Sequence, residues 1–456
     1  YTLSLHDALP ICMTAAWRVR ENRLKLCDEE KLFSRDAKRG RSLTGHTLVV
    51  GAGMSGLSVA LALLHRGHAA SVLERGAVGG ESSWAGGGIL SPLLPWNYAG
   101  PVSALALRSM AAYADWVANI EAISGRDAEF WRCGMLALDV TAPEQALAWC
   151  ATHGMAAQRG YPDALHRAPD TLKVALKDSS FVITSEVKQS GTLAESKPDG
   201  SPRFFEPRDD RINQRILDKE GHIWLPDVAQ VRNPRLVAAL RAAVLRLGGK
   251  IREECPVTGV LTQGGRVTAV RTKTDTFPAD SVVLATGAWS GMGLAELGAM
   301  PHIRPIRGQM LLFKLEPGVL DTILYRNGLY LIPRRDGHVL VGSTLEDAGF
   351  DKSIDAATHQ RLHAEAAELL PILADARPVR HWSGLRPGSP GNIPVIDHHP
   401  DFDNVFVNAG HYRYGVTMAP ASAELLLDLM EGSPPALDPA PYRWQAALAR
   451  RWTEAL

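Results

Sequence analysis

An uncharged run, residues 47–64, constrains the fold of this chain more than any other feature of its sequence. It reads TLVVGAGMSGLSVALALL. By length and hydropathy such a run could form a helix that spans a membrane. Its glycines, however, follow an apolar stretch with the spacing G-x-G-x-x-G, which is typical of a strand that turns tightly into a helix. Residues 70–73 (ASVL) predict the next strand, so the run indicates a β-α-β unit and not a stable membrane insertion.

The glycine spacing predicts a dinucleotide site. Gly51 permits the tight turn, Gly53 lets the backbone approach a pyrophosphate, and Gly56 lets the helix pack close to the strand. The pyrophosphate would accept hydrogen bonds from the free N–H groups at the helix N-terminus. Glu74 ends the second strand, where a carboxylate can bind ribose hydroxyls and disfavours a 2′-phosphate. The candidate cofactor residues of this unit are Gly51, Ala52, Gly53, Met54, Ser55, Gly56, Glu74 and Arg75.

The composition excludes several classes of protein. Of the 456 residues, 46% are hydrophobic and 21% charged, which is ordinary for a globular chain large enough for two domains. The 49 lysines and arginines balance 49 aspartates and glutamates, whereas a nucleic-acid partner would require a basic excess. No two cysteines have the CxxC spacing, so we expect neither a disulfide framework nor a zinc site, and the reducing cytoplasm is the simplest compartment.

Residues 1–46 differ from the rest of the chain. They have no amphipathic period and lack the apolar core of a signal peptide. The opening YTLSLHDALPI resembles translated sequencing-adapter sequence. We expect residues 1–46 to be a non-native or disordered extension, with a disordered native tail as the alternative.

A second glycine-rich stretch, residues 79–90 (GGESSWAGGGIL), favours a flavin over a nicotinamide. Its serines offer hydrogen-bond donors, and its three consecutive glycines leave a path on which a flat ring can lie against the backbone. A flexible glycine loop is the alternative. The candidate cofactor residues here are Ser82, Ser83, Ala85, Gly86, Gly87 and Gly88.

Later apolar runs divide the chain between two domains. Residues 281–287 (SVVLATG) predict a strand, and residues 404–409 predict another that leads through GHYRYG into a helix at 416–430. We therefore assign to the nucleotide-binding domain the segments 47–100, 231–300 and 382–435. The substrate-binding domain would comprise 101–230 and 301–381, with a polar insertion at 177–221, and 436–456 would be a C-terminal tail.

The second domain is predicted to be a mixed, largely antiparallel sheet covered by helices. Residues 304–315 predict a strand, and Asp336-Gly337 predicts a hairpin turn between two apolar runs. Helical patterns lie at 103–122 and 358–370. The fold class is thus α/β, with a Rossmann-like FAD-binding domain and an α+β substrate domain.

Several motifs together resemble those of one family. GAGMSGLSVALAL, GGESSWAGGGIL, VVLATGAWS, YLIPR, WSGLRPGSPGNIPVID and AGHYRYGVTMAP occur in the order typical of the D-amino-acid oxidase superfamily of flavoproteins. Within it the chain looks most similar to the glycine oxidases of thiamine biosynthesis, over residues 46–450. The resemblance implies noncovalent FAD, oxidation of a small amino acid at its α-carbon to the imine with H₂O₂ as by-product, O₂ as acceptor, and a homo-oligomer, specifically a homotetramer.

The resemblance also implies site residues. Arg386, in WSGLRPG, matches the arginine that binds the substrate carboxylate, and a guanidinium suits a carboxylate because it forms two parallel hydrogen bonds. A structural salt bridge is the alternative, and the surrounding prolines and glycines predict a stiff turn. Tyr330 matches a pocket tyrosine, and Arg413 matches an arginine close to flavin and substrate. Tyr414 occupies a position at which the family often has asparagine. Leu345 matches a pocket position of the family and would form an apolar wall of the substrate pocket. The remaining candidate cofactor residues are Val257, Thr286, Gly287, Trp289, Gly410, His411, Arg413, Tyr414, Gly415, Val416 and Thr417.

Other functions remain open at this stage. A D-amino-acid dehydrogenase with a quinone acceptor would share these motifs, and glycine, sarcosine and small D-amino acids are not distinguished. A covalent-flavin sarcosine oxidase, a tRNA-modifying flavoprotein and a noncatalytic flavoprotein are less favoured. The run DHHPD at 397–401 predicts a solvated loop and no metal site, because adjacent histidines seldom chelate one ion. Met292, Met310 and Met418 are predicted to be packing residues.

Overall fold

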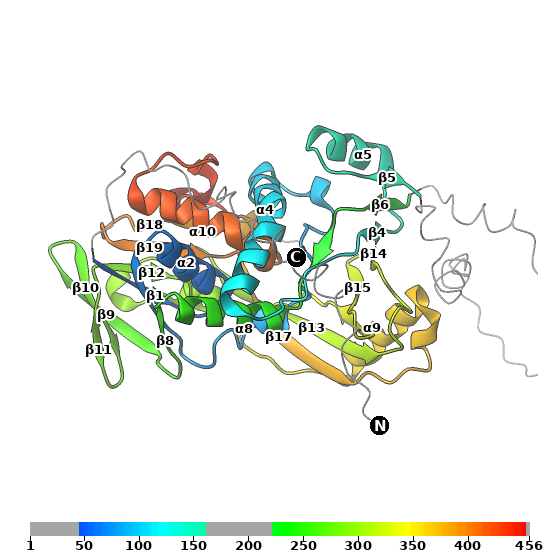
Figure 1. Ribbon diagram of the computed structural model, residues 1–456, viewed down its shortest axis with the longest axis horizontal. Helices are drawn as coiled ribbons and strands as arrows, with labels where there is room; N and C mark the ends of the chain where they lie inside the picture. Colours follow the sequence, from blue (N-terminus) through cyan, green and yellow to red (C-terminus); the bar gives the residue numbers. More distant parts are fainter. Residues whose placement is uncertain (1–44, 161–220, 453–456) are drawn as a thin grey trace, which may run out of the picture.

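The structure is a computed structural model that describes residues 45–160 and 221–452. The extension predicted at 1–46 and the insertion predicted at 177–221 therefore lie almost entirely outside the described residues. Two lobes lie along the long axis of the molecule, each built on its own sheet (Figure 1). None of the helices described in these ranges is long and apolar enough to cross a membrane.

The first lobe contains the predicted β-α-β unit. Strand β1, helix α2 and strand β2 form from its apolar run, its glycine turn and the second apolar run, and β1 and β2 pair in parallel. They belong to a six-stranded sheet with the order β18-β19-β12-β1-β2-β8, in which only β18 runs antiparallel to its neighbour. The bounds are His46–Val50 (β1), Met54–His65 (α2), Ala69–Leu73 (β2), Lys250–Arg252 (β8), Ser281–Leu284 (β12), Val395–His398 (β18) and Val405–Ala409 (β19).

Both faces of this sheet are covered, which is why its strands are apolar on both sides. Val49 packs in a core with helices α2, α4, α8 and α10, whereas Leu48 and Val50 pack in a second core with a three-stranded antiparallel sheet, β9 to β11. The bounds are Gly100–Ser124 (α4), Asn233–Arg246 (α8), Gly415–Glu431 (α10), Val257–Gln263 (β9), Arg266–Thr272 (β10) and Thr276–Pro278 (β11).

Helix α4 corrects one predicted domain boundary. We placed residues 101–230 with the substrate domain, but α4 packs on α10 and α8 of the nucleotide-binding lobe (Figure 1). Its buried residues Val102, Leu105 and Trp116 share the core of α2. An amphipathic pattern predicts a buried helical face, but it does not reveal which core receives that face.

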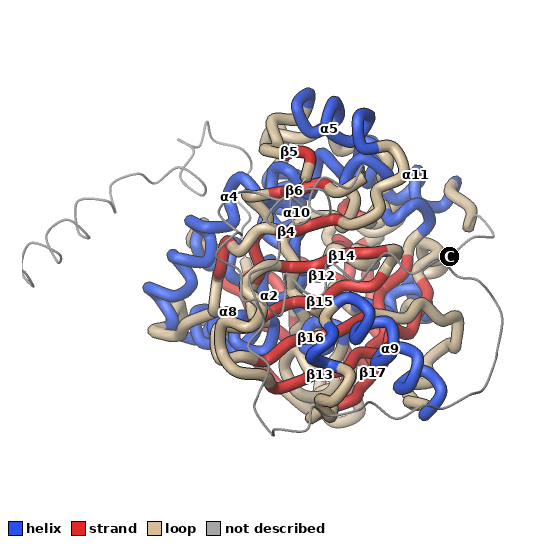
Figure 2. The backbone as a smooth tube through the Cα atoms, turned by 90° about the vertical axis from the view of Figure 1, so that its right-hand side faces the viewer, coloured by secondary structure: helices blue, strands red, loops and turns tan. Residues whose placement is uncertain are grey.

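The second lobe is the predicted mixed sheet. Its strands follow the order β17-β13-β16-β15-β14-β4-β6-β5, and only β14 and β4 pair in parallel. Helix α9 (Ala356–Leu369) packs on this sheet (Figure 2), and the predicted hairpin turns at Gly337, whose φ is +82°. The bounds are Met135–Ala137 (β4), Gln158–Arg159 (β5), Ile223–Leu225 (β6), Arg304–Lys314 (β13), Ile323–Arg326 (β14), Leu329–Pro333 (β15), His338–Gly342 (β16) and Arg380–Gly388 (β17). Shorter or peripheral elements are α3 (Ser82–Ala85), α5 (Pro143–Thr152), β3 (Trp131–Arg132) and β7 (Ala229–Gln230).

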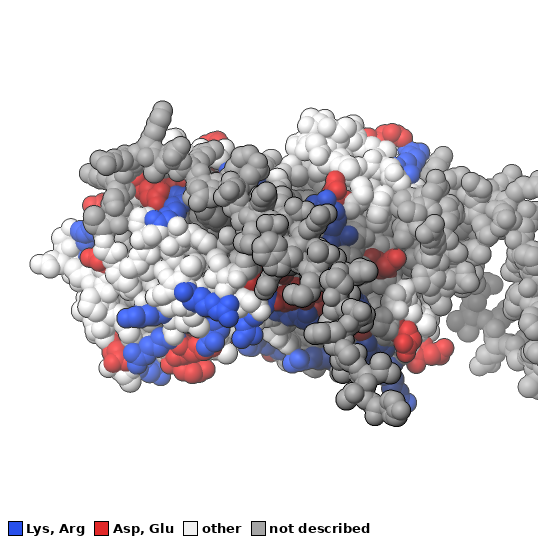
Figure 3. All heavy atoms as spheres, in the orientation of Figure 1, with Lys and Arg blue, Asp and Glu red and all other residues white. Residues whose placement is uncertain are grey.

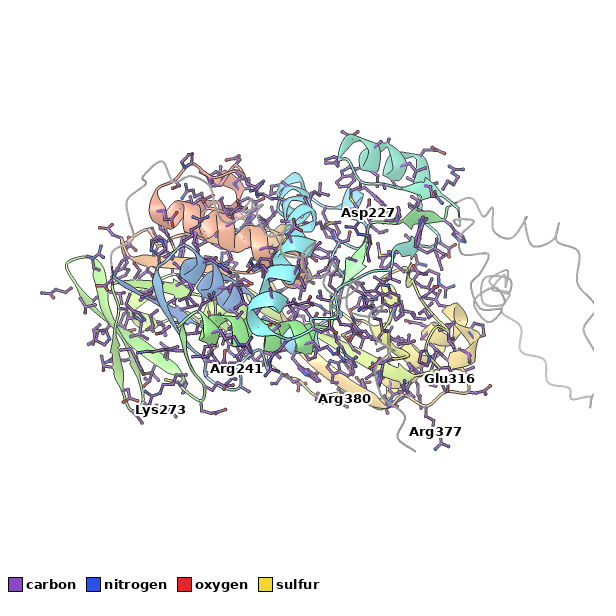
Figure 4. The ribbon with its side chains drawn as sticks, in the orientation of Figure 1. Asp227, Arg241, Lys273, Glu316, Arg377 and Arg380 are labelled. Atoms are coloured by element: carbon purple, nitrogen blue, oxygen red, sulfur yellow. The ribbon has the colours of Figure 1, made fainter. Side chains whose placement is uncertain are left out.

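The prediction of a turn around Arg386 is wrong. Residues Arg380–Gly388 form β17, which pairs with β13 along its whole length. The strand begins at Arg380 near the lower edge of the molecule (Figure 4). Because β17 lies at the edge of its sheet, Pro387 removes no hydrogen bond that a further strand would need. Residues 382–388, predicted for the nucleotide-binding domain, thus belong to the large sheet.

Two further predictions require correction. The DHHPD run is a solvated loop only in part: His398, Pro400 and Asp401 are exposed, but Asp397 is 4% exposed and accepts hydrogen bonds from Arg443 Nη1 (2.5 Å) and Trp444 N (2.8 Å). His399 is 2% exposed. The predicted C-terminal tail contains helix α11 (Trp444–Ala449), which packs on β18.

Of the three methionines predicted to pack, Met310 and Met418 are buried, but Met292 is 70% exposed and that prediction is wrong. On the surface drawn in Figure 3, basic and acidic side chains are interspersed along the lower edge.

Candidate active site

A cavity of about 790 Å³ contacts both lobes. It lies where the parallel strands β1, β2 and β12 end, the usual position of a ligand in an open α/β sheet, and it reaches β13, β15 and β17 of the large sheet. Most predicted site residues line it: Gly51, Gly53, Met54, Ser55, Glu74, Arg75, Ser82, Ser83, Ala85, Gly86, Gly87, Gly88, Val257, Thr286, Gly287, Trp289, Tyr330, Arg386, His411, Arg413, Tyr414, Gly415 and Val416.

Four predicted site residues lie behind the cavity wall: Ala52, Gly56, Gly410 and Thr417. A Cβ on Gly56 would fall 1.9 Å from the carbonyl oxygen of Gly51. Gly56 therefore allows α2 to lie close to the end of β1 and does not itself line the cavity. Gly410 has a φ of +79°, and its carbonyl accepts a hydrogen bond from Ser389 Oγ at 2.5 Å. Thr417 Oγ1 donates to Ile89 O at 3.0 Å.

The start of α2 presents the features that an anionic group requires. The N-cap residue, Gly53, provides no side-chain hydrogen bond, and free N–H groups at a helix N-terminus attract anions. Ser83 Oγ accepts a hydrogen bond from Met54 N at 2.8 Å, which holds the second glycine-rich stretch against the helix. Glu74 accepts from Ala52 N at 2.7 Å and Gly76 N at 3.0 Å, so its carboxylate is fixed at the end of β2.

The glycine loop 86–88 is held by a buried arginine that sequence reasoning quoted only as part of a motif. Arg334 donates to Gly87 O at 2.7 Å, Val231 O at 3.0 Å and Gln230 Oε1 at 2.5 Å. Burial lowers its pKa to about 10. A Cβ on Gly87 would lie 2.6 Å from Ile332 Cδ1, so a larger residue here would displace the end of the Ile332 side chain.

Asn233 is a site residue that sequence reasoning missed. It lines the cavity and is completely buried. Neither polar atom of its amide has a hydrogen-bond partner among the described residues. It also lies directly behind the glycine loop, since a Cβ on Gly86 would fall 2.9 Å from its Nδ2. The sequence signal, an asparagine followed by a proline in the first turn of α8, is ordinary for a helix start.

Arg386 is a cation without an acidic partner. It donates to Thr344 O at 3.1 Å, Ser343 Oγ at 2.5 Å and Arg307 O at 3.4 Å, and no carboxylate of a described residue forms an ion pair with it. The guanidinium occupies space that Gly308 leaves open, because a Cβ on Gly308 would lie 2.1 Å from Nη1. The alternative of a structural salt bridge therefore has no support in the described part of the chain.

The other two predicted catalytic residues also line the cavity. Tyr330 is 9% exposed. Burial alone would lower the pKa of Arg413, but the phenol groups of Tyr98, Tyr414 and Tyr412 hold it above its usual value. Tyr414, the departure from the family pattern, donates a hydrogen bond to the Tyr98 hydroxyl. Arg413, like Arg386, forms no ion pair with a carboxylate of a described residue.

His411 should make stability depend on pH. It is 1% exposed, lies against Ser55 Oγ (3.3 Å) and Ser422 Oγ (3.0 Å), and burial lowers its pKa to about 4. Between its ordinary pKa of 6.5 and 4, the unfolded state binds a proton that the folded state does not. The free energy of unfolding should therefore fall as pH drops through this window, by on the order of 2–3 kcal/mol between pH 7 and 4.5.

The measurement is denaturant unfolding of the wild type and of His411→Gln at both pH values. The glutamine amide can still contact the two serines but does not titrate. We expect the variant to lose on the order of 2–3 kcal/mol less on acidification than the wild type. Equal losses in the two proteins would assign the acid sensitivity to other groups.

The described geometry fits FAD. A helix N-terminus and a fixed carboxylate suit the pyrophosphate and ribose, the glycine loop leaves a flat surface, and the unpartnered amide of Asn233 offers a donor and an acceptor there. Together, the parallel sheet, the glycine turn and the cavity are those of a dinucleotide-binding oxidoreductase. Residues 46–429 match the family described as DAO, FAD dependent oxidoreductase, and the chain belongs to this family. The predicted family and cofactor are thereby confirmed.

Similarity to individual proteins is strong over most of the chain. Glycine oxidase of Pseudomonas putida is 40% identical over 401 residues, which cover 88% of this chain and 98% of that protein. A Synechocystis protein named bifunctional protein ThiO/ThiG is 30% identical, over 85% of this chain and 52% of its own length. The crystal structure of glycine oxidase from Geobacillus kaustophilus matches with a TM-score of 0.73 and 26% identity, covering 88% of this chain and 99% of that one.

Proposed function

We propose that this protein is a glycine oxidase, which oxidises glycine to its imine and reduces O₂ to H₂O₂. The observation that carries the proposal is Arg386, a cation on the cavity wall whose hydrogen bonds go to neutral oxygens. A substrate carboxylate would balance the charge of Arg386 and accept hydrogen bonds from its guanidinium. The similarity to glycine oxidase of Pseudomonas putida supports glycine as the substrate, with sarcosine and small D-amino acids as further candidates.

In this proposal the side chains orient the substrate and contribute little proton transfer. Arg386 binds the carboxylate and fixes the direction of the α-carbon, and the buried ring of Tyr330 limits the size of the substrate. Bound FAD supplies the acceptor for a hydride from the α-carbon. Arg413 and the N-terminus of α10 place positive charge on one side of the cavity, where negative charge on a reduced cofactor would be stabilised. The amine must be neutral when the hydride leaves, because its lone pair forms the imine.

The experiment is to add glycine to the purified holoenzyme and follow O₂ uptake and peroxide together. Equal amounts of O₂ consumed and H₂O₂ formed are expected. Turnover with a quinone analogue but without O₂ uptake would support the rival proposal, a D-amino-acid dehydrogenase. A panel of sarcosine, D-alanine and D-proline would rank the substrates.

The cellular setting belongs to the same proposal. The imine would supply the thiazole ring of thiamine, in agreement with the relatives named bifunctional protein ThiO/ThiG. The described cysteines, Cys133, Cys150 and Cys255, are free thiols, which is compatible with the reducing cytoplasm. Noncovalent attachment of FAD and a homotetramer stay predictions, which acid precipitation of the yellow protein and light scattering would test.

Gly308→Ala should weaken glycine binding although residue 308 itself carries no reactive group. The new Cβ would lie 2.1–2.4 Å from three guanidinium atoms of Arg386, so Arg386 must move. We expect KM for glycine to rise about tenfold or more, because small displacements of a positioning group are costly. Gly100→Ala is the control, since its Cβ would meet no atom within 4 Å. Steady-state kinetics of both variants give KM for glycine. An unchanged KM in Gly308→Ala would show that the position of the Arg386 guanidinium is not critical.

A further inference from the structure

Arg386 rests on a polar network that sequence reasoning did not detect. Two of its three acceptors are backbone carbonyls, those of Thr344 and Arg307. The segment that contains Thr344 follows β16, and Arg307 lies on β13. The position of the guanidinium therefore depends on how these two pieces of backbone are held together.

Glu346 joins the two pieces. Its Oε2 accepts from Arg307 Nε at 2.8 Å and Nη2 at 2.5 Å. Its Oε1 accepts hydrogen bonds from the Thr344 hydroxyl and from Gln309 Nε2, the latter at 3.0 Å. Its backbone exchanges two further bonds with Arg307, at 2.9 and 3.0 Å. One side chain thus contacts both residues whose carbonyls accept from Arg386.

The network keeps its charges separate from Arg386. Glu346 is paired with Arg307 at 2.5 Å, and Arg307 also contacts Asp351 at 2.6 Å, so Glu346 has its own cationic partner and forms no ion pair with Arg386. Burial alone would raise the pKa of Glu346, but hydrogen bonds from Thr344, Arg307 and Gln309 hold it below its usual value. Glu346 is therefore ionised at neutral pH and remains in the network, while the charge of Arg386 stays available to a ligand.

We propose that Glu346 is a positioning residue for the carboxylate anchor: by clamping Thr344 to Arg307, it fixes the two carbonyls that orient the guanidinium of Arg386. The inference rests on the proposed function, because it assigns to Arg386 the binding of the substrate carboxylate. Glu346 does not line the cavity, so it acts on the substrate only through other residues.

The test is Glu346→Gln in the holoenzyme. Glutamine keeps the size of the side chain but offers one oxygen where the clamp needs two acceptors. We expect KM for glycine to rise about tenfold and kcat to change less than about threefold, the pattern of lost ground-state binding. Acetate, a small carboxylate probe, should bind about tenfold more weakly. Its binding is followed by the change in flavin absorbance. Glu144→Gln, which breaks an exposed ion pair with Arg159 away from the cavity, is the matched control and should change neither value.

A double-mutant cycle separates positioning from general damage. In an Arg386→Met background, Glu346→Gln should add no further loss of acetate affinity, because the anchor is already gone. An additive loss, or a fall in kcat without a change in KM, would overturn the inference. The single variants separate the two proposals. If Arg386→Met alone leaves acetate and glycine binding unchanged, the proposed role of Arg386 fails. If Arg386→Met weakens binding and Glu346→Gln does not, only the positioning role of Glu346 fails. Should Glu346→Gln fold poorly, Thr344→Val removes the hydroxyl of the same clamp and is measured in the same cycle.

Discussion

Arg386→Met should raise KM for glycine by about 30-fold to a few thousandfold. The expected loss is about 2–5 kcal/mol, the usual cost of removing one partner of a close charged pair. The effect should be large because, within residues 45–160 and 221–452, no carboxylate pairs with Arg386, so its charge is available to the ligand. Steady-state kinetics with glycine measure it, and acetate binding gives an independent value.

Two variants are the controls for this prediction. Arg386→Lys keeps the charge but loses the two parallel hydrogen bonds, so an intermediate KM is expected. Arg241→Met removes a 45% exposed arginine at the molecular surface (Figure 4) and should leave KM unchanged. A wild-type KM in Arg386→Met would remove Arg386 from the site and leave glycine recognition to another group such as Arg413.

Gly56→Ala should weaken FAD binding by about 5- to 150-fold. The new Cβ would lie 1.9 Å from Gly51 O. Neither atom can rotate away, because the backbone of residue 56 fixes the Cβ and Gly51 O is itself a backbone atom. The start of α2 must therefore move from β1, and overpacking of this kind costs about 1–3 kcal/mol. The displaced atoms are those of the glycine turn, so we expect the loss in cofactor affinity as well as in stability.

The measurement is the FAD dissociation constant, obtained by titrating the apoprotein and following flavin fluorescence. Ser58→Ala, two residues further along α2, is the control: its hydroxyl is buried and has no hydrogen-bond partner among the described residues, so its removal should leave FAD binding intact. A normal affinity in Gly56→Ala would show that the helix can move without disturbing the turn.

Sequence reasoning succeeded where local chemistry determines local structure. The G-x-G-x-x-G turn has only one common solution between a strand and a helix, so β1, α2 and β2 were predictable, as was the hairpin at Asp336-Gly337. The motifs also identified many residues of the cavity wall, because those of the nucleotide-binding lobe lie where a strand ends or a helix begins.

Contacts between distant segments were not predictable in the same way. The composition around Arg386 indicates a turn, yet an edge strand tolerates the same prolines and glycines. Glu346 and Gly308 carry no signal in their immediate neighbourhood, because each acts through an arginine on another strand: Glu346 contacts Arg307 of β13, and Gly308 leaves space for Arg386 of β17. Likewise, nothing in the pattern of α4 reveals that it packs on α10.

Because Arg386 lies on β17, substrate recognition depends on the register in which β17 pairs with β13. Arg386 lies opposite Ile306, and Leu385 lies opposite Arg307. Side chains alternate between the two faces of a sheet, so a slip of one residue in this pairing would move Arg386 to the opposite face. A single-residue insertion or deletion within Arg380–Gly388 could therefore abolish glycine recognition while the FAD-binding turn of β1 and α2 stays intact. Evolution of a new substrate preference in this fold could thus proceed by a shift of strand alignment as well as by exchange of side chains.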